Sequence, residues 1–234
     1  MQFKEIKAPS IRELFVQQLV DMILSGQLQP GDRLPTEREL ADDMKISKTV
    51  VHEGIRELHR LGFLDIASRQ GVSVADYAQN GNLDTLLTIM RHHGGRLDVK
   101  TTQSLLKVRY YLEGPAFEEL AASHTDADIE KLEELQRQAE AAAREGLHPF
   151  AEALFRYHRA VVFLSGNSIT PLILNAFVSA SIAFWKEYIE RDGTDTCLRQ
   201  LETFTECIRS GDGHRASVML LEGLENFQRQ THLT

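Results

Sequence analysis

The segment 45–60 and the residues just after it concentrate positively charged side chains. These cations are Lys45, Lys48, Arg56, Arg60 and Arg69. Ammonium and guanidinium groups bind phosphate oxygens, and an arginine can also donate two hydrogen bonds to the edge of a guanine base. This chemistry suits a nucleic acid, provided that an element of the fold presents the cations on one face.

Two short helices joined by a tight turn would do so. The first begins at a capping box, in which the Thr36 hydroxyl accepts a hydrogen bond from the Glu39 amide and the Glu39 carboxylate reaches back to the Thr36 amide. Residues 45–46 leave room for a tight turn, and Ser47 can cap a second helix that Gly62 ends. Because a second helix that is polar on its outward side fits the major groove, the pattern predicts DNA binding.

A small β-hairpin is expected after these helices. The β-prone runs 63–66 and 72–74 flank the loop 67–71, which predicts a hairpin wing. Together with a preceding helix, the two helices and the wing fill residues 10–76. We therefore predict a winged helix-turn-helix domain over residues 1–78.

From residue 83 onward the strand signal disappears and helical patterns continue to the end of the chain. The predicted helices cover 83–93, 99–123, 126–145, 149–165, 168–191, 195–210 and 212–231. We therefore predict a mainly α protein whose second domain, 79–234, is an all-helical bundle. Such a bundle is large enough to dimerise the protein, to enclose a ligand, or to do both.

The net charge of −8 is spread over both parts of the chain. Residues 1–78 contain 10 Lys and Arg against 12 Asp and Glu, and the rest contains 16 against 22. DNA affinity depends on where cations lie rather than on net charge, so this balance weakens the DNA-binding prediction without excluding it. Two cysteines are too few for a disulfide framework, and no apolar run approaches the roughly 18 residues of a membrane helix. We expect a cytoplasmic protein with no membrane partner.

Two stretches of the sequence resemble known domains. Residues 30–41, Pro-Gly-Asp-Arg-Leu-Pro-Thr-Glu-Arg-Glu-Leu-Ala, resemble the opening of the DNA-binding domain of the GntR family, and the sequence continues to resemble it through 62–64. The helical remainder resembles the FCD ligand-binding domain of the FadR-like subgroup. Its marks are Arg109 with Leu112 and Glu113, residues 155–167 around His158, and Ser210-Gly211-Asp212 with Ala216. The resemblance implies a dimeric bacterial transcription regulator, usually a repressor, whose affinity for an inverted repeat in double-stranded DNA changes when a metabolite enters the helical domain.

The resemblance also implies a set of DNA-contacting residues. They are Arg38, Ser47, Lys48, Thr49, His52, Arg56, Arg69 and Gly71. Lys48 and His52 stand where the family generally has arginine, and neither can grip guanine as rigidly, so the operator is expected to differ from that of most relatives. The alternative for Lys48 and Arg56 is an ordinary solvated helix face, and Gly71 could serve only to allow a positive φ.

Many FCD domains hold a divalent metal through an aspartate four residues before a histidine and through two later histidines. This chain keeps His158, but Leu154, Leu201 and Gly223 stand at the other three positions. Glu152 lies six residues before the histidine, around the helix from it, and is a poor substitute. We predict no metal and no cofactor.

Without a metal, side chains would have to bind the effector. Arg109 is the strongest candidate for a carboxylate or phosphate, and the equal alternative is a structural ion pair with Glu113, four residues on. His158 and Asn167 complete the predicted effector site. The leucines at the metal positions would make a pocket more apolar, which favours an organic acid, sugar acid or acyl compound with a hydrocarbon portion.

Two further classes of protein remain open. An enzyme built on the bundle is disfavoured because the sequence contains no phosphate loop, no Ser/His/Asp order and no multi-carboxylate metal set. An effector-independent protein that binds DNA and dimerises through a solid bundle stays possible. A sizeable cavity near Arg109 and His158 would favour the regulator over this alternative.

Overall fold

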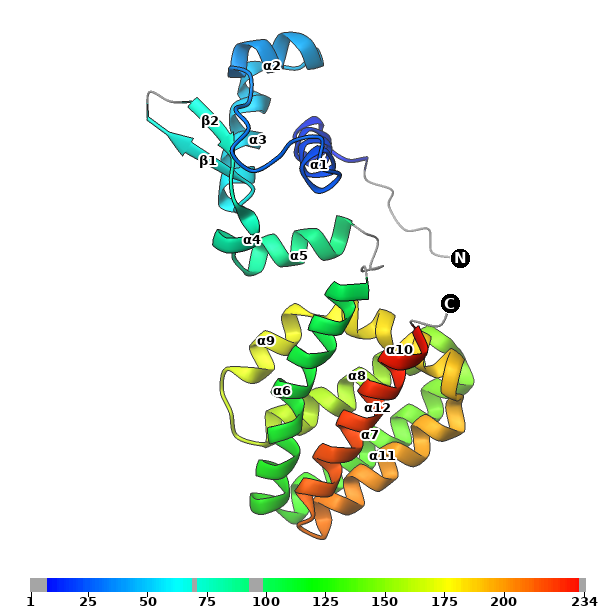
Figure 1. The fold of residues 1–234 in the computed structure, drawn as a ribbon. Coiled ribbons are helices and arrows are strands. Elements are labelled where there is room, and N and C mark those ends of the chain that lie inside the picture. Colours follow the sequence, from blue (N-terminus) through cyan, green and yellow to red (C-terminus); the bar gives the residue numbers. More distant parts are fainter. Residues whose placement is uncertain (1–7, 69–70, 93–98, 232–234) are drawn as a thin grey trace. The chain divides into compact units, whose positions relative to one another are not determined.

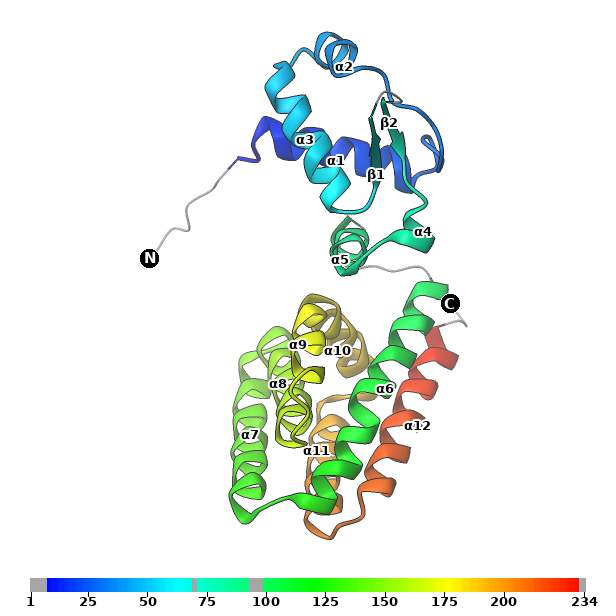
Figure 2. The same cartoon turned by 90° about the vertical axis from the view of Figure 1, so that its left-hand side faces the viewer.

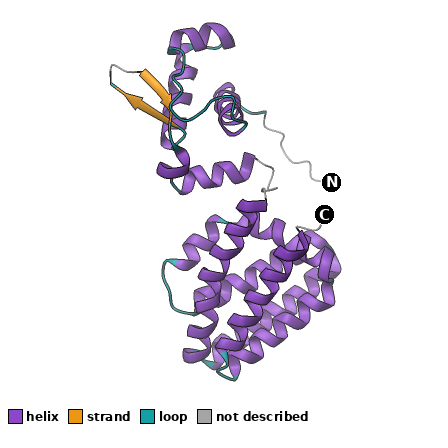
Figure 3. Cartoon of the chain, in the orientation of Figure 1, coloured by secondary structure: helices purple, strands orange, loops and turns teal. Residues whose placement is uncertain are grey.

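The computed structural model describes residues 8–68, 71–92 and 99–231. Arg69, one of the predicted DNA contacts, lies outside the described residues. The chain divides into two compact units, Met1–Arg96 and Leu97–Thr234. Figure 3 shows helices in both units and one antiparallel pair of strands in the first. The mainly α class, with a winged helix-turn-helix followed by a helical domain, is confirmed.

The described part of the first unit contains three helices, the wing and two further helices (Figure 1). Their bounds are α1 Ile11–Leu24, α2 Glu37–Met44, α3 Lys48–Arg60, β1 Leu64–Ala67, β2 Gly71–Val74, α4 Tyr77–Asn80 and α5 Leu83–His92. The capping box that begins α2 is present: Thr36 Oγ1 accepts from the Glu39 amide at 3.3 Å, and Glu39 accepts from the Thr36 amide at 2.8 Å. These bonds satisfy amides that would otherwise have no partner at the helix start.

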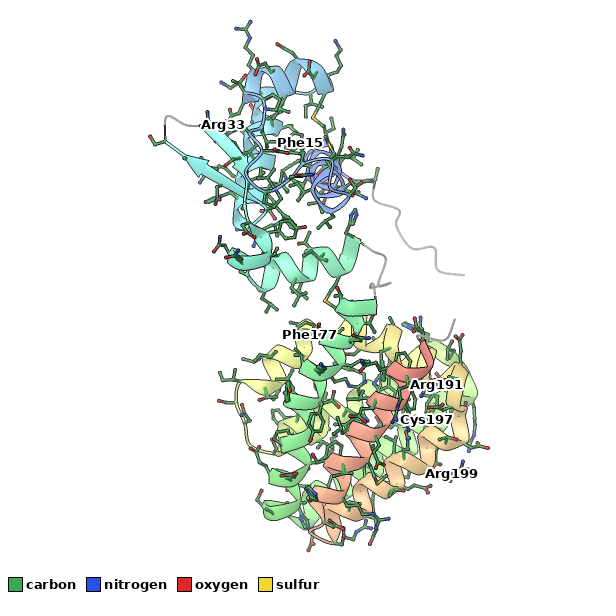
Figure 4. The ribbon with its side chains drawn as sticks, in the orientation of Figure 1. Phe15, Arg33, Phe177, Arg191, Cys197 and Arg199 are labelled. Atoms are coloured by element: carbon green, nitrogen blue, oxygen red, sulfur yellow. The ribbon has the colours of Figure 1, made fainter. Side chains whose placement is uncertain are left out.

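The apolar side of α3 forms the centre of this unit. Val51, Ile55 and Leu58 are buried there against α1. A Cβ atom at Gly54 would lie 2.3 Å from the ring of Phe15, so glycine is needed for the two helices to pack this closely. Phe15 is labelled on α1 in Figure 4. This packing leaves the polar side of α3 facing outward.

The wing is an antiparallel hairpin whose register runs from Leu64 opposite Val74 to Ala67 opposite Gly71. The chain leading into α2 lies beside its second strand, since the Leu34 amide donates to the Val72 carbonyl at 2.9 Å. Gly71 has a φ of 89°, a conformation that side-chain-bearing residues rarely adopt. This conformational requirement accounts for the glycine at that position.

Helices α4 and α5 belong to the first unit, although the sequence placed the domain boundary between residues 78 and 79. Thr85 is buried and its hydroxyl donates to the Leu61 carbonyl at 2.7 Å, which attaches α5 to the end of α3. The short helix α4 occupies residues 77–80, which lie across the predicted boundary. The two compact units meet in sequence between Arg96 and Leu97 instead.

The second unit is a bundle of seven described helices (Figure 2). They are α6 Val99–Ser123, α7 Asp126–Glu145, α8 Leu147–Leu164, α9 Thr170–Ala176, α10 Val178–Asp192, α11 Thr194–Arg209 and α12 Gly213–Thr231. Helix α6 packs along α12, and α7 packs along α8. The core includes the fully buried side chains of Phe117, Leu120, Leu132 and Tyr157.

The predicted helix over 168–191 is in fact two helices. They meet at Phe177, which has the non-helical ψ of 14°, and their axes differ by 72°. Phe177 is buried and is labelled at this junction in Figure 4. No single helix among the described residues is long and apolar enough to cross a membrane, and α9 with α10 passes that test only as this bent pair, on length and composition alone.

Candidate DNA-binding and effector sites

The outward side of α3 presents most of the predicted DNA contacts together. Lys48, Thr49, His52 and Arg56 are all exposed there. Ser47 begins the helix, and its Oγ accepts from the Val50 amide at 3.3 Å. Since the opposite side of the helix is buried, this polar face is fixed in orientation by the core of the unit.

The turn between α2 and α3 is tight because Lys45 adopts a left-handed conformation, with φ 57° and ψ 39°. The Ile46 amide then donates to the Ala41 carbonyl at 3.1 Å. Among described non-glycine residues this is the one positive φ, a conformation that costs an L-residue roughly 1 kcal/mol. The sequence identified the turn but not the backbone conformation that closes it.

His52 contacts a residue that the sequence did not single out. Its Nδ1 lies 2.7 Å from Oε1 of Glu37, the first residue of α2, with the two side chains 53% and 29% exposed. This bond crosses between the helices and leaves Nε2 as the imidazole nitrogen free to meet DNA. Residues 15 positions apart on different helices carry no local sequence signal of such a pair.

Arg38 lies on α2 rather than α3. Its side chain is 88% exposed and approaches Asp42 at 3.9 Å, a spacing at which an exposed pair adds little stability. Arg38 is therefore available to a phosphate. Gly71 is exposed in the wing.

In the helical unit, a buried ionic cluster joins α6 to α8. The Arg109 Nε donates to Glu113 Oε1 at 2.6 Å, and His158 Nδ1 lies 2.8 Å from Glu113 Oε2. The three residues are 7%, 1% and 1% exposed. The ion pair of Arg109 with Glu113 that the sequence allowed is thus present, and His158 extends it.

The protonation states follow from this geometry. Burial raises the pKa of Glu113, but the charge of Arg109 and the hydrogen bond from His158 outweigh burial and hold the pKa at about 2. Burial lowers the pKa of His158, and the neighbouring carboxylate opposes this only in part. An ionised carboxylate can only accept, so the proton of a neutral His158 is on Nδ1 and Nε2 has a lone pair.

Two aromatic side chains of α10 enclose the guanidinium. The Arg109 Cζ lies 4.6 Å from the ring centre of Phe184 and 4.5 Å from that of Trp185. The ring of Trp185 is also 4.9 Å from that of His158. Nothing local in the sequence distinguishes an aromatic that stacks on a buried arginine from one that fills space, so the sequence did not predict this contact.

The other predicted effector residue, Asn167, lies elsewhere. It is exposed, and its Oδ1 accepts from the amides of Ile169 and Thr170 at 2.9 and 3.0 Å, so it holds the connection into α9. The structure does not bring it to the ionic cluster. The asparagine at this position therefore stabilises a turn.

The structure places the three residues that stand at the family's metal-ligand positions as follows. Leu154 and Leu201 are buried in the core, and a Cβ at Gly223 would meet the Tyr188 hydroxyl at 3.4 Å. Among the described residues no group of three or more His, Cys, Asp or Glu side chains could hold a metal ion.

A winged helix-turn-helix with an outward polar helix is the architecture of a DNA-binding protein. Residues 11–74 match the model of the bacterial regulatory proteins of the gntR family, and residues 104–226 match the FCD domain. The chain belongs to the GntR family of bacterial regulatory proteins, in the group that has an FCD domain. This membership decides against the enzyme alternative.

Curated relatives agree with the assignment, and a solved structure has a similar fold. The chain is 23% identical to the transcriptional regulator LutR of Bacillus subtilis, over 88% of this chain and 94% of LutR. It is 29% identical to the fatty acid metabolism regulator protein of Proteus mirabilis, over 73% and 69%. Lar, which controls expression of the Listeria monocytogenes agr system, has a solved structure with TM-score 0.62 and 15% identity over 97% of this chain and 99% of that one. That likeness concerns the fold alone.

Proposed function

We propose that this protein is a transcription repressor that binds an inverted-repeat operator as a homodimer through α3, and that a small-molecule metabolite in the helical domain changes its affinity. The observation that supports this most strongly is the exposed polar face of α3 formed by Lys48, His52 and Arg56. Two such helices, one from each protomer, would read the two half-sites. A cytoplasmic location, as expected from the sequence, is part of this proposal.

We further propose that the effector domain works without a metal ion. His158 already donates from Nδ1 to Glu113, and buried leucines occupy two of the positions where ligands would be needed. Leucine side chains cannot coordinate a cation, so the residues present do not fit the metal that many FCD domains hold. In place of a metal ion, the buried guanidinium of Arg109 would supply the positive charge for a carboxylate effector.

The effector-independent alternative has one observation in its favour. The cavity that lies against Arg109 has a volume of about 30 Å³, close to the space of one water molecule rather than of a large metabolite. If the core were closed to every ligand, no compound would change the thermal stability of the protein. A thermal-shift screen of organic acids, sugar acids and acyl thioesters decides between the two, because a ligand of the folded state raises the melting temperature.

Operator binding is tested by selecting duplexes from a random pool with the full-length protein and measuring affinity by fluorescence anisotropy. We expect a palindromic site, a dimer by sedimentation, and an Arg56→Ala variant at least about tenfold weaker. Arg60→Ala is the matched control. It removes the same charge from the same helix, but its guanidinium is engaged by Glu57 and Asp84 at 2.8 and 2.6 Å. Equal losses for both variants at controlled salt, or no loss for either, would contradict the role of Arg56.

A further inference from the structure

On its exposed side, helix α3 presents a histidine between two cationic side chains. His52 lies one turn after Lys48 and one turn before Arg56, and all three residues are exposed. Lysine and arginine side chains can only donate hydrogen bonds, whereas an imidazole changes both its charge and its hydrogen-bonding role between about pH 5 and about pH 8. What His52 offers to a DNA base therefore depends on which of its two ring nitrogens has a hydrogen atom.

A side chain of α2 decides where that hydrogen atom lies. Nδ1 of His52 is 2.7 Å from Oε1 of Glu37, the first residue of α2, which packs against α3 (Figure 1). An ionised carboxylate can only accept, so Nδ1 donates in both the neutral and the protonated imidazole. Because the two ring nitrogens point in different directions, this bond holds the ring with Nε2 directed away from Glu37.

Glu37 is the one carboxylate paired with His52 in the part of the chain that the structure describes. Most other charged side chains of α1, α2 and the first strand of the wing have contacts elsewhere. They are Arg12 with Glu53, Glu13 with Ser10, Asp21 with His92, Arg38 with Asp42 and Glu39 with Thr36, to which Asp43 and Asp65 are added without such a contact being needed here. The hydrogen-bonding role of His52 is thus set by one partner, which can be replaced without changing α3.

The two protonation states of His52 present opposite hydrogen-bonding groups to DNA. A neutral imidazole that donates from Nδ1 has a lone pair on Nε2, which can accept from the amino group of adenine or cytosine in the major groove. A protonated imidazole has a hydrogen atom on Nε2 as well, and this can donate to N7 or O6 of guanine. Glu37 disfavours the other neutral tautomer, in which Nε2 would donate at every pH.

We propose that the His52–Glu37 pair makes base recognition by this protein depend on pH. At high pH the pair selects adenine or cytosine at one position of each half-site, and at low pH it selects guanine at the same position. Glu37 is a positioning residue, because it acts on the DNA only through His52. The inference rests on the proposed function, since it requires α3 to lie in the major groove of an operator.

The test measures the affinity of the full-length protein for its selected operator and for duplexes changed at single half-site positions, at fixed salt and at about pH 5.5 and about pH 8. The position that His52 reads is the one at which His52→Ala loses its base preference. At that position we expect the ratio of affinities for cytosine and guanine duplexes to change at least about fivefold between the two pH values. The other positions should keep their preferences, because lysine and arginine side chains stay charged over this range.

Three variants test the contact from the side of the protein. Glu37→Gln keeps the size of the side chain but can bond either tautomer of His52, so the preference for adenine or cytosine at high pH should weaken about threefold. His52→Arg should prefer guanine at both pH values, since arginine only donates. His59→Gln is the matched control and should keep the pH dependence. It removes another imidazole from α3, whose Nδ1 is 2.7 Å from the Leu64 carbonyl oxygen of the wing.

The outcomes separate this inference from the proposed function. A protein that prefers no duplex overturns both. A sequence-specific protein whose base preferences are the same at both pH values, or whose pH dependence survives His52→Ala, keeps the proposed function and overturns the inference. An equal gain in affinity for every duplex at low pH also overturns it, because that result identifies a contact with phosphate rather than with a base. A preference at high pH that Glu37→Gln leaves unchanged overturns the positioning role of Glu37.

Discussion

Replacing the buried carboxylate by an amide, Glu113→Gln, should destabilise the helical domain and make its stability less dependent on pH. The folded-state pKa of Glu113, about 2, lies below its ordinary value of 4.5. At about 1.4 kcal/mol for each tenfold, this difference corresponds to roughly 3 kcal/mol at neutral pH. Because the pKa is lowered on folding, the stabilisation is fully present above about pH 4.5 and is lost as the pH falls through about 2.

The assay is urea unfolding followed by the fluorescence of Trp185, which reports the helical domain alone because the first unit contains no tryptophan. At pH 7 we expect the variant to be less stable than the natural protein by roughly 3 kcal/mol, in the range typical of a broken buried ion pair. At pH 3 the difference should shrink to roughly 1 kcal/mol, since much of the Glu113 contribution is then lost.

A matched control is Glu134→Gln in the same domain. Glu134 is exposed and bonded to Arg137 and Gln138, so its replacement should change stability little at either pH. A Glu113→Gln variant as stable as the natural protein at pH 7 would refute the reasoning. A loss that stays the same at pH 3 would show that shape rather than charge is responsible.

The other predictions concern the recognition helix and the metal. Glu37→Gln removes a negative charge from beside His52 while keeping an acceptor, so operator binding should tighten at low salt. His52→Arg should shift the preferred base at one position of each half-site. Unchanged affinity and base preference in both variants would exclude a role for the pair. Chelators should leave the melting temperature of the protein unchanged. Protein purified without a histidine tag should contain no stoichiometric metal, and a transition metal bound at His158 would contradict this prediction.

Local chemistry made much of the DNA-binding unit predictable. The capping box of Thr36 and Glu39 and the cap at Ser47 depend on residues three positions apart, so the sequence shows them directly. The hydrophobic spacing of α3 likewise separates a buried from an exposed side. The face that presents Lys48 and Arg56 follows from those two signals.

Tertiary contacts determine the features that the sequence did not show. The bend at Phe177 has no proline or glycine to mark it, and its aromatic side chain is buried where α9 and α10 meet. The stacking of Arg109 on Trp185 joins residues that are 76 positions apart, so no local pattern in the sequence predicts it. The hydrogen bond from Thr85 to the Leu61 carbonyl attaches α5 to the first unit, and it too joins residues that are far apart in the sequence.

The most direct measurement of the central claim is the affinity of the full-length protein for its selected operator, with and without a saturating compound that raises the melting temperature in the thermal-shift screen. We expect the operator to be bound at least about a thousandfold more tightly than a scrambled duplex, and the ligand to change that affinity at least about fivefold. Equal affinity for the operator and the scrambled duplex would contradict a sequence-specific regulator. An operator affinity that no ligand changes would contradict control through the helical domain.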